Sequence, residues 1–81
     1  MKHAFSQKFI RQYRALPPTL KAKVDKQIVF LIANLHHPSL RAKKYDEANN
    51  VWQARVDDRY RFYFRIEADT YKILSVTSHP K

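Results

Sequence analysis

The segment VWQARVDDRYRFYFRIEADTYKILSVTSH, from Val51 to His79, is the most informative part of the sequence. Successive side chains on a β-strand point to opposite faces, so the residues from Tyr60 to Ile66 divide into two sets. One face carries Tyr60, Phe62, Phe64 and Ile66, and the other carries Arg61, Tyr63 and Arg65. The stretch predicts three consecutive antiparallel strands, with the phenylalanines buried and the arginine face turned outward.

The turn between the first two of these strands decides which residues face each other. A three-residue turn at Asp57-Asp58-Arg59 places Arg55 opposite Arg61. A two-residue turn would instead pair Arg55 with Tyr60 and mix the two faces, so the alternation predicts the longer turn. Two arginines side by side repel each other unless an anion lies over them. This pair is the first indication that the outward face binds phosphate.

The first half of the chain carries two helical patterns. Ser6 is suited to cap a helix that runs to about Leu16, and Pro17-Pro18 ends that helix and opens a second one, which runs to about Asn34. The apolar residues of the second pattern recur at helical spacing and are Leu20, Val24, Ile28, Leu31, Ile32 and Leu35. Neither helix is stable alone, so both are expected to pack on the aromatic sheet face.

These elements predict one α+β domain that covers residues 1–81. An N-terminal helical hairpin packs on one face of a small, mostly antiparallel sheet, in the order β-α-α-β-β-β, with the first strand starting at Lys2. The basic segment from Leu40 to Tyr45 adds one more strand if it forms a sheet edge.

Two residue types are missing from the sequence, cysteine and glycine. Without cysteine there is no disulfide, thiolate zinc site or cysteine nucleophile, and without glycine there is no P-loop or dinucleotide-binding loop. Adjacent His36 and His37 have no acidic neighbour to complete a ligand set, so we expect neither metal nor cofactor. No apolar run approaches the ~20 residues of a membrane span, and the N-terminus lacks a signal-peptide pattern. A cytoplasmic protein without membrane contact is expected.

The formal net charge of +9 is concentrated in the first half of the chain. Residues 1–44 contain ten Lys and Arg against one acid, which gives 10 − 1 = +9, whereas residues 45–81 contain six of each, which gives 6 − 6 = 0. A basic surface of this kind favours nucleic acid, an acidic protein or an anionic membrane as partner. The alternative is that the lysines serve only solubility.

The whole pattern resembles the RelE/ParE superfamily of toxins from bacterial type II toxin–antitoxin systems. The resemblance lies in the basic helical hairpin, a K-x-Y segment at residues 43–45, the core VWQARVDDRYRFYF, which looks like W-x-x-R-V-x-x-x-Y-R, and a last strand that ends near a histidine. It covers almost the whole chain. It implies a toxin that an acidic cognate antitoxin holds inactive, with DNA contacted only indirectly through the antitoxin complex.

This family uses one fold for two activities, so the fold alone does not choose between them. RelE-like members are metal-independent endonucleases that cut mRNA in the ribosomal decoding site, and ParE-like members inhibit DNA gyrase without being nucleases. Arg61 together with His79 favours the RelE-like branch. A ParE-like inhibitor or a non-toxic RNA-binding relative remains the alternative, because many nuclease members continue past this point with a further basic or aromatic residue.

RNA cleavage without a metal requires a base for the 2′-hydroxyl, a cation for the phosphate and an acid for the leaving 5′-oxygen. The resemblance assigns phosphate stabilisation to Arg61 and acid or base catalysis to His79. Arg55 matches another arginine of the family core, and it either binds phosphate or pairs with a nearby acid such as Asp57, Asp58 or Glu47.

The basic segment before the long stretch adds further candidates. Lys43 and Lys44 fall where family members carry basic or acid–base residues, so either can bind phosphate or accept a proton, with backbone contact the favoured role. Glu47 is a rival base. Tyr45 and Tyr63 are suited to stack on bases, or they serve only packing.

Overall fold

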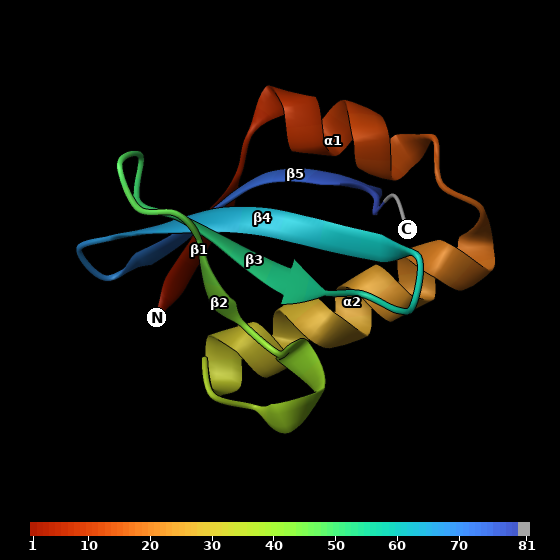
Figure 1. Cartoon of the computed structure of the whole chain (residues 1–81). Coiled ribbons are helices and arrows are strands. Elements are labelled where there is room, and N and C mark those ends of the chain that lie inside the picture. Colours follow the sequence, from red (N-terminus) through yellow and green to blue (C-terminus); the bar gives the residue numbers. More distant parts are fainter. Residues whose placement is uncertain (80–81) are drawn as a thin grey trace.

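Two helices and five strands make up the fold of residues 1–79, the part of the chain that the computed structural model describes (Figure 1). In chain order the elements are β1 (Lys2–Phe5), α1 (Gln7–Arg14), α2 (Pro18–Ala33), a short 3₁₀ turn η1 (Pro38–Leu40), β2 (Lys43–Asp46), β3 (Val51–Arg55), β4 (Tyr60–Glu67) and β5 (Thr70–Ser78). The expected α+β order is confirmed, and the basic segment supplies β2 as the additional edge strand.

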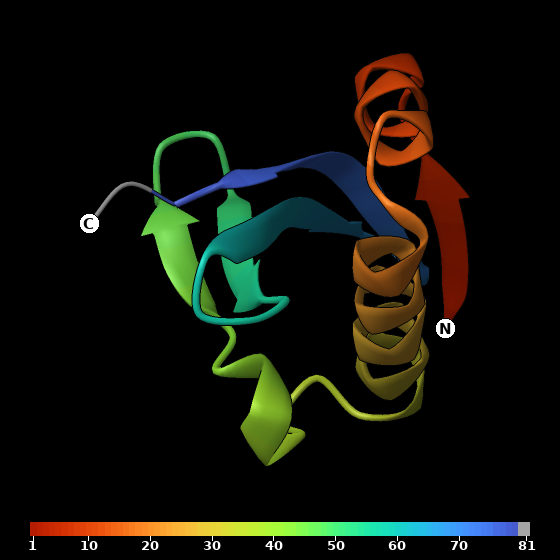
Figure 2. The same ribbon diagram turned by 90° about the vertical axis from the view of Figure 1, so that its right-hand side faces the viewer.

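The five strands form a single sheet in the order β1-β5-β4-β3-β2. Strand β1 is parallel to β5, and every other neighbouring pair is antiparallel. Figure 2 shows α1 and α2 on one side of strands β2, β3 and β4, while no helix of residues 1–79 covers the other side. We call this uncovered side the open face.

Capping and proline residues set the helix ends close to where the sequence places them. The Ser6 hydroxyl oxygen accepts the Phe9 N–H at 3.0 Å and donates to the Leu74 carbonyl at 2.6 Å, so the cap also ties α1 to β5. Helix α1 ends at Arg14, two residues before the expected Leu16, and α2 ends at Ala33. Within residues 1–79 no helix is long and apolar enough to cross a membrane.

The core lies between the helices and the sheet. Phe62 and Phe64 of β4 have no exposed surface, as the alternation predicts, and burying each phenylalanine contributes about 1.5–3 kcal/mol. Arg61 and Tyr63 are half-buried on the open face. The buried apolar residues form one cluster, which consists of Phe9, Leu20, Val24, Ile28, Leu31, Leu40, Ala54, Val56, Phe62, Phe64, Tyr71, Ile73 and Val76.

Strand register confirms the three-residue turn. Arg55 is paired with Arg61, and the Val56 N–H donates to the Tyr60 carbonyl at 3.0 Å across the turn. On the next strand a bulge interrupts the alternation, because Tyr63 pairs with Ser75 whereas Phe64 pairs with Ile73. The bulge lets Ile73 and Val76, three residues apart, both enter the core.

Candidate functional site

A basic pocket of about 230 Å³ lies on the open face. It is lined by Arg41, Lys43, Gln53, Arg55, Arg61 and His79, which come from β2, β3, β4, the end of β5 and the segment after η1. Four of the five residues predicted from the sequence therefore meet in one place, namely Lys43, Arg55, Arg61 and His79. Among the described residues that line the pocket, four are arginine or lysine and none is acidic. Such a pocket is built to receive an anion.

Arg61 is held in the pocket by the turn that precedes it. Its Nη1 donates to the Asp57 carbonyl at 2.5 Å and to the Tyr60 carbonyl at 2.9 Å. A guanidinium has five N–H donors in a rigid fork, so an Arg61 anchored through one nitrogen still presents its other donors to a ligand. The turn thus fixes the direction of the charge before an anion arrives.

Arg55 forms the pairing with an acid that was one of the two roles left open by the sequence, and its role toward phosphate stays a prediction. It lines the pocket opposite Arg61, and its guanidinium also forms an ion pair with the Asp58 carboxylate. The Asp58 side chain is largely exposed, so water and salt screen this pair and it contributes little to stability. A phosphate can replace Asp58 as the partner of Arg55 at low cost.

His79 reaches the pocket from the end of β5. Its backbone N–H donates to the Arg59 carbonyl at 2.5 Å, which continues the pairing with β4 past Ser78. The side chain is exposed at the rim of the pocket. An imidazole ring can both donate and accept a proton, so this position suits a proton donor or acceptor to a bound phosphate ester.

Lys44 does not join the pocket, because adjacent residues of a strand point to opposite faces. Its ammonium lies 5.3 Å from the centre of the Trp52 ring and 3.9 Å from the Glu47 carboxylate. Glu47, the rival base, is therefore paired with Lys44 rather than with a pocket residue. Only Lys43 of the two lysines faces the pocket.

Sequence reasoning missed two lining residues. Gln53 is buried and sits two positions before Arg55 on the same face of β3, so the alternation already contained the signal. Its Nε2 donates to the Tyr63 hydroxyl at 3.1 Å. Arg41 follows η1 in the left-handed backbone region, at φ 46°. No periodic pattern covers that loop, so its path to the pocket required the structure.

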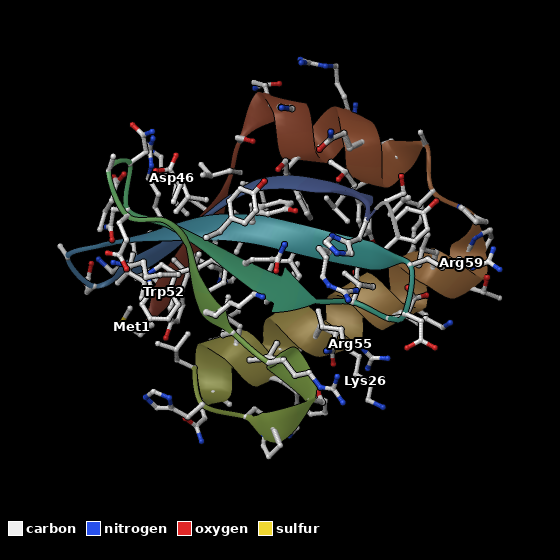
Figure 3. All side chains as sticks on the ribbon, in the orientation of Figure 1. Met1, Lys26, Asp46, Trp52, Arg55 and Arg59 are labelled. Carbon is white, nitrogen blue, oxygen red and sulfur yellow. The ribbon has the colours of Figure 1, made fainter. Side chains whose placement is uncertain are left out.

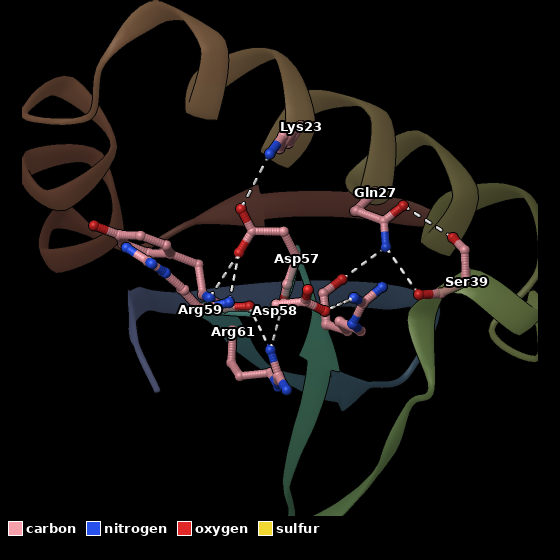
Figure 4. A network of polar contacts seen from close by, with 9 residues as sticks. Lys23, Gln27, Ser39, Asp57, Asp58, Arg59 and Arg61 are labelled. Carbon is pink, nitrogen blue, oxygen red and sulfur yellow. Dashed lines mark hydrogen bonds and ion pairs between the residues drawn. The ribbon is translucent and has the colours of Figure 1, made fainter. Parts of the chain in front are cut away.

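Behind the pocket, Gln27 of α2 joins three segments (Figure 4). Its Nε2 donates to the Arg55 carbonyl at 2.7 Å and to the Ser39 carbonyl at 3.1 Å, and its Oε1 accepts the Ser39 hydroxyl at 2.9 Å. The side chain is only 5% exposed, so all three bonds are shielded from water. The network fixes the end of β3 and the 3₁₀ turn that leads to Arg41.

Asp57 organises the turn that carries Arg61. Partial burial raises the pKa of Asp57, but hydrogen bonds from the amides of Arg59 and Tyr60, at 2.8 and 2.9 Å, and an ion pair with Lys23 outweigh it and hold the pKa below its ordinary value. Figure 3 shows Arg55 and Arg59 near this turn and Asp46 at the opposite end of the sheet. Residues 1–79 contain no group of three or more potential ligands placed to hold a metal ion.

Comparison of the sequence with protein-family models gives no match, and comparison with curated proteins gives none either. The fold has close structural neighbours. The YoeB/ParE toxin from Agrobacterium tumefaciens superposes with a TM-score of 0.83 at 13% identity, covering 99% of this chain and 100% of the toxin. The RelE–RelB complex from Pyrococcus horikoshii OT3 gives a TM-score of 0.79 at 15% identity, and the match covers 95% of this chain and 92% of the matched chain. The RelBE2 toxin–antitoxin complex from Mycobacterium tuberculosis gives a TM-score of 0.75 at 23% identity, and the match covers 96% of this chain and 96% of the matched chain. The chain has the RelE/ParE fold, as the resemblance implies.

Proposed function

We propose that this chain is the toxin of a type II toxin–antitoxin system and that it cleaves mRNA on the ribosome without a metal ion. The basic pocket carries the proposal, because it places Arg55, Arg61 and Lys43 around one site with His79 at the rim. Several neighbours in fold are described as toxins or as toxin–antitoxin complexes, which supports the toxin part of the proposal.

In the proposed reaction the 2′-oxygen of the RNA attacks the adjacent phosphorus, and the bond from phosphorus to the 5′-oxygen breaks. The products are a 2′,3′-cyclic phosphate and a 5′-hydroxyl. Arg61 and Arg55 stabilise the extra negative charge on the phosphate oxygens in the transition state. His79 in its protonated form donates a proton to the leaving 5′-oxygen, and a water molecule or the neutral amine form of Lys43 accepts the proton of the 2′-hydroxyl.

The deciding variant is Arg61→Ala. Loss of one donor aimed at the developing charge typically costs ~10²–10³ in rate, so cleavage and growth arrest should be abolished. Primer extension maps mRNA ends after induction of the wild type and of the variant. Arg65→Ala is the matched control, since Arg65 lies on the same face of β4 outside the pocket and donates to the Asn49 carbonyl. It should cleave as the wild type does.

Growth arrest by the wild type with every mRNA intact and gyrase activity reduced would move the assignment to the ParE-like branch. Equal loss of cleavage in Arg61→Ala and Arg65→Ala would show that general basicity, rather than the pocket, is what matters.

The proposed antitoxin is acidic, because residues 1–44 carry a net +9 and Arg55 and Arg61 add positive charge in the pocket on the open face. An amphipathic acidic segment that crosses both surfaces would neutralise them and block access to Arg61. Electrostatic steering makes such an association fast and sensitive to salt. Stopped-flow association with the purified partner tests this, and an association rate that is the same at low and high salt contradicts it.

A further inference from the structure

A second hollow, of about 420 Å³, lies on the open face next to the basic pocket. Its lining consists of the aromatic Tyr45 and Tyr63, the apolar Val51 and Leu74, the hydroxyl-bearing Ser75 and Thr77, and Lys8 of α1. Tyr45 is 61% exposed, a large fraction for an aromatic residue outside the core. Neither the stability of the core nor the chemistry of the basic pocket accounts for this exposed ring.

The hollow and the basic pocket are adjacent, because a residue of one contacts a residue of the other. Gln53 lines the basic pocket, is paired with Tyr63 across the sheet, and donates its Nε2–H to the Tyr63 hydroxyl at 3.1 Å. Residues two apart on a strand are separated by about 7 Å on the same face, so Tyr63 lies one such step from Arg61 along β4. When a ligand occupies the basic pocket, the group bonded next to its anion can therefore reach the tyrosines.

The two rings are arranged edge to face, with centroids 4.9 Å apart and planes at 62°. This contact holds Tyr45 at a defined angle although most of its surface is exposed. Unpaired bases stack on such rings, and the stacking tolerates any base because each one has a π-face. Lys8 at the edge of the hollow supplies a further positive charge for a neighbouring phosphate.

We propose that Tyr45 and Tyr63 form a nucleobase subsite, in which an unpaired base of a single-stranded RNA stacks on Tyr45 while the adjacent phosphate lies in the basic pocket. The inference deepens the proposed function and depends on it for the identity of the strand. Val51 and Leu74 give the hollow an apolar surface for the face of a ring, and the hydroxyl groups of Ser75, Thr77 and Tyr63 and the cation of Lys8 suit the polar edge of that ring and the phosphate joined to it.

The test uses fluorescently labelled single-stranded RNAs with 2′-O-methyl riboses, which cannot be cleaved, in a series that carries an abasic site at each position in turn. Fluorescence anisotropy measures their binding to the full chain. For the wild type, one abasic position should weaken binding about 10-fold or more, because the stacking of one base on an aromatic ring typically strengthens binding by about that factor. Tyr45→Ala should lose the same factor with intact RNA and become insensitive to the abasic site at that position.

Two variants control for general effects of substitution. Tyr45→Phe keeps the ring and should bind as the wild type does. Val29→Ala removes an apolar side chain that is 63% exposed on α2 and should not change the abasic profile. Because Tyr45 is exposed, its removal should leave the protein folded, which circular dichroism checks.

The inference is overturned if the wild type does not bind these RNAs, if Tyr45→Ala keeps the full abasic penalty, or if Tyr45→Ala weakens binding of a protein partner but not of RNA. The cleavage assay and the binding assay can fail independently. If the wild type cleaves mRNA but Tyr45→Ala binds the abasic series as the wild type does, only the subsite is disproved. If binding of the abasic series depends on Tyr45 but the wild type leaves mRNA intact, only the endonuclease proposal is disproved.

Discussion

On β4, residues one position apart lie in opposite environments. Phe62 and Phe64 have no exposed surface beneath the helices, whereas Arg61 and Tyr63 line hollows on the open face. The buried face gathers apolar side chains, and the open face gathers cations that repel one another. The two-residue period of the strand therefore assigns the core to one face of β4 and the candidate site to the other. Substitutions at alternate positions should affect either stability or binding and spare the other.

The largest effect on stability is expected from Phe62→Ala. Truncation of a fully buried phenylalanine removes its burial energy and leaves a cavity, at a typical cost of about 3–5 kcal/mol. Urea unfolding followed by circular dichroism measures the loss. Arg61→Ala, the neighbour on the open face, should change the free energy of unfolding by far less while it abolishes cleavage. Comparable destabilisation by the two variants would break the division between the faces.

A smaller loss of stability is expected from Gln27→Leu, which tests the hydrogen bonds that join α2 to Arg55 and Ser39 behind the pocket. Leucine fills a similar volume but leaves the carbonyls of Arg55 and Ser39 without their shared donor. An unsatisfied buried polar group costs about 1–3 kcal/mol, so the variant should lose stability in that range. Gln7→Leu makes the same substitution at an exposed helical position and should be nearly neutral. An equal effect at both positions would contradict the role assigned to the network.

The sequence predicted the fold in detail wherever side-chain alternation or helical spacing was strong. The pairing of Arg55 with Arg61 and the burial of Phe62 followed directly from the two-residue period. It did not predict the bulge at Leu74, because a bulge breaks that period to bring two apolar residues into the core. Ala68 adopts a positive φ of 54°, a conformation that alanine does not favour and that the chain context imposes.

The candidate site was only partly predictable, because only some of its residues lie on strands with strong alternation. Residues on central strands, such as Arg61 and Gln53, have faces that alternation assigns. Arg41 reaches the pocket through a loop, where no periodicity applies. Lys43 and Lys44 were equal candidates until the register of β2 placed them on opposite faces. The roles of the pocket residues in cleavage stay predictions for the variants above.

The smallest effect is expected from the charge of Asp57, which supports the turn between the buried and the open face. Its pKa in the folded protein lies below the ordinary value of 3.8, so the folded state favours the carboxylate. The resulting stability is complete above the ordinary pKa and is lost as the pH falls through the lowered one. Asp57→Asn keeps an oxygen for the amides of Arg59 and Tyr60 but removes the charge that pairs with Lys23.

Urea unfolding of the wild type and of Asp57→Asn at a series of pH values measures this contribution. The wild type should be the more stable at neutral pH, and the two curves should converge as the pH falls below about 4, near the unfolded pKa of an aspartate. Asp46 also has a lowered pKa, chiefly because the Asn49 side chain donates to its carboxylate. It is present in both proteins, so the difference between the curves isolates Asp57. A difference that stays constant down to the lowest pH would mean that Asp57 acts through its shape, and the charge would then play no part in holding the turn that directs Arg61.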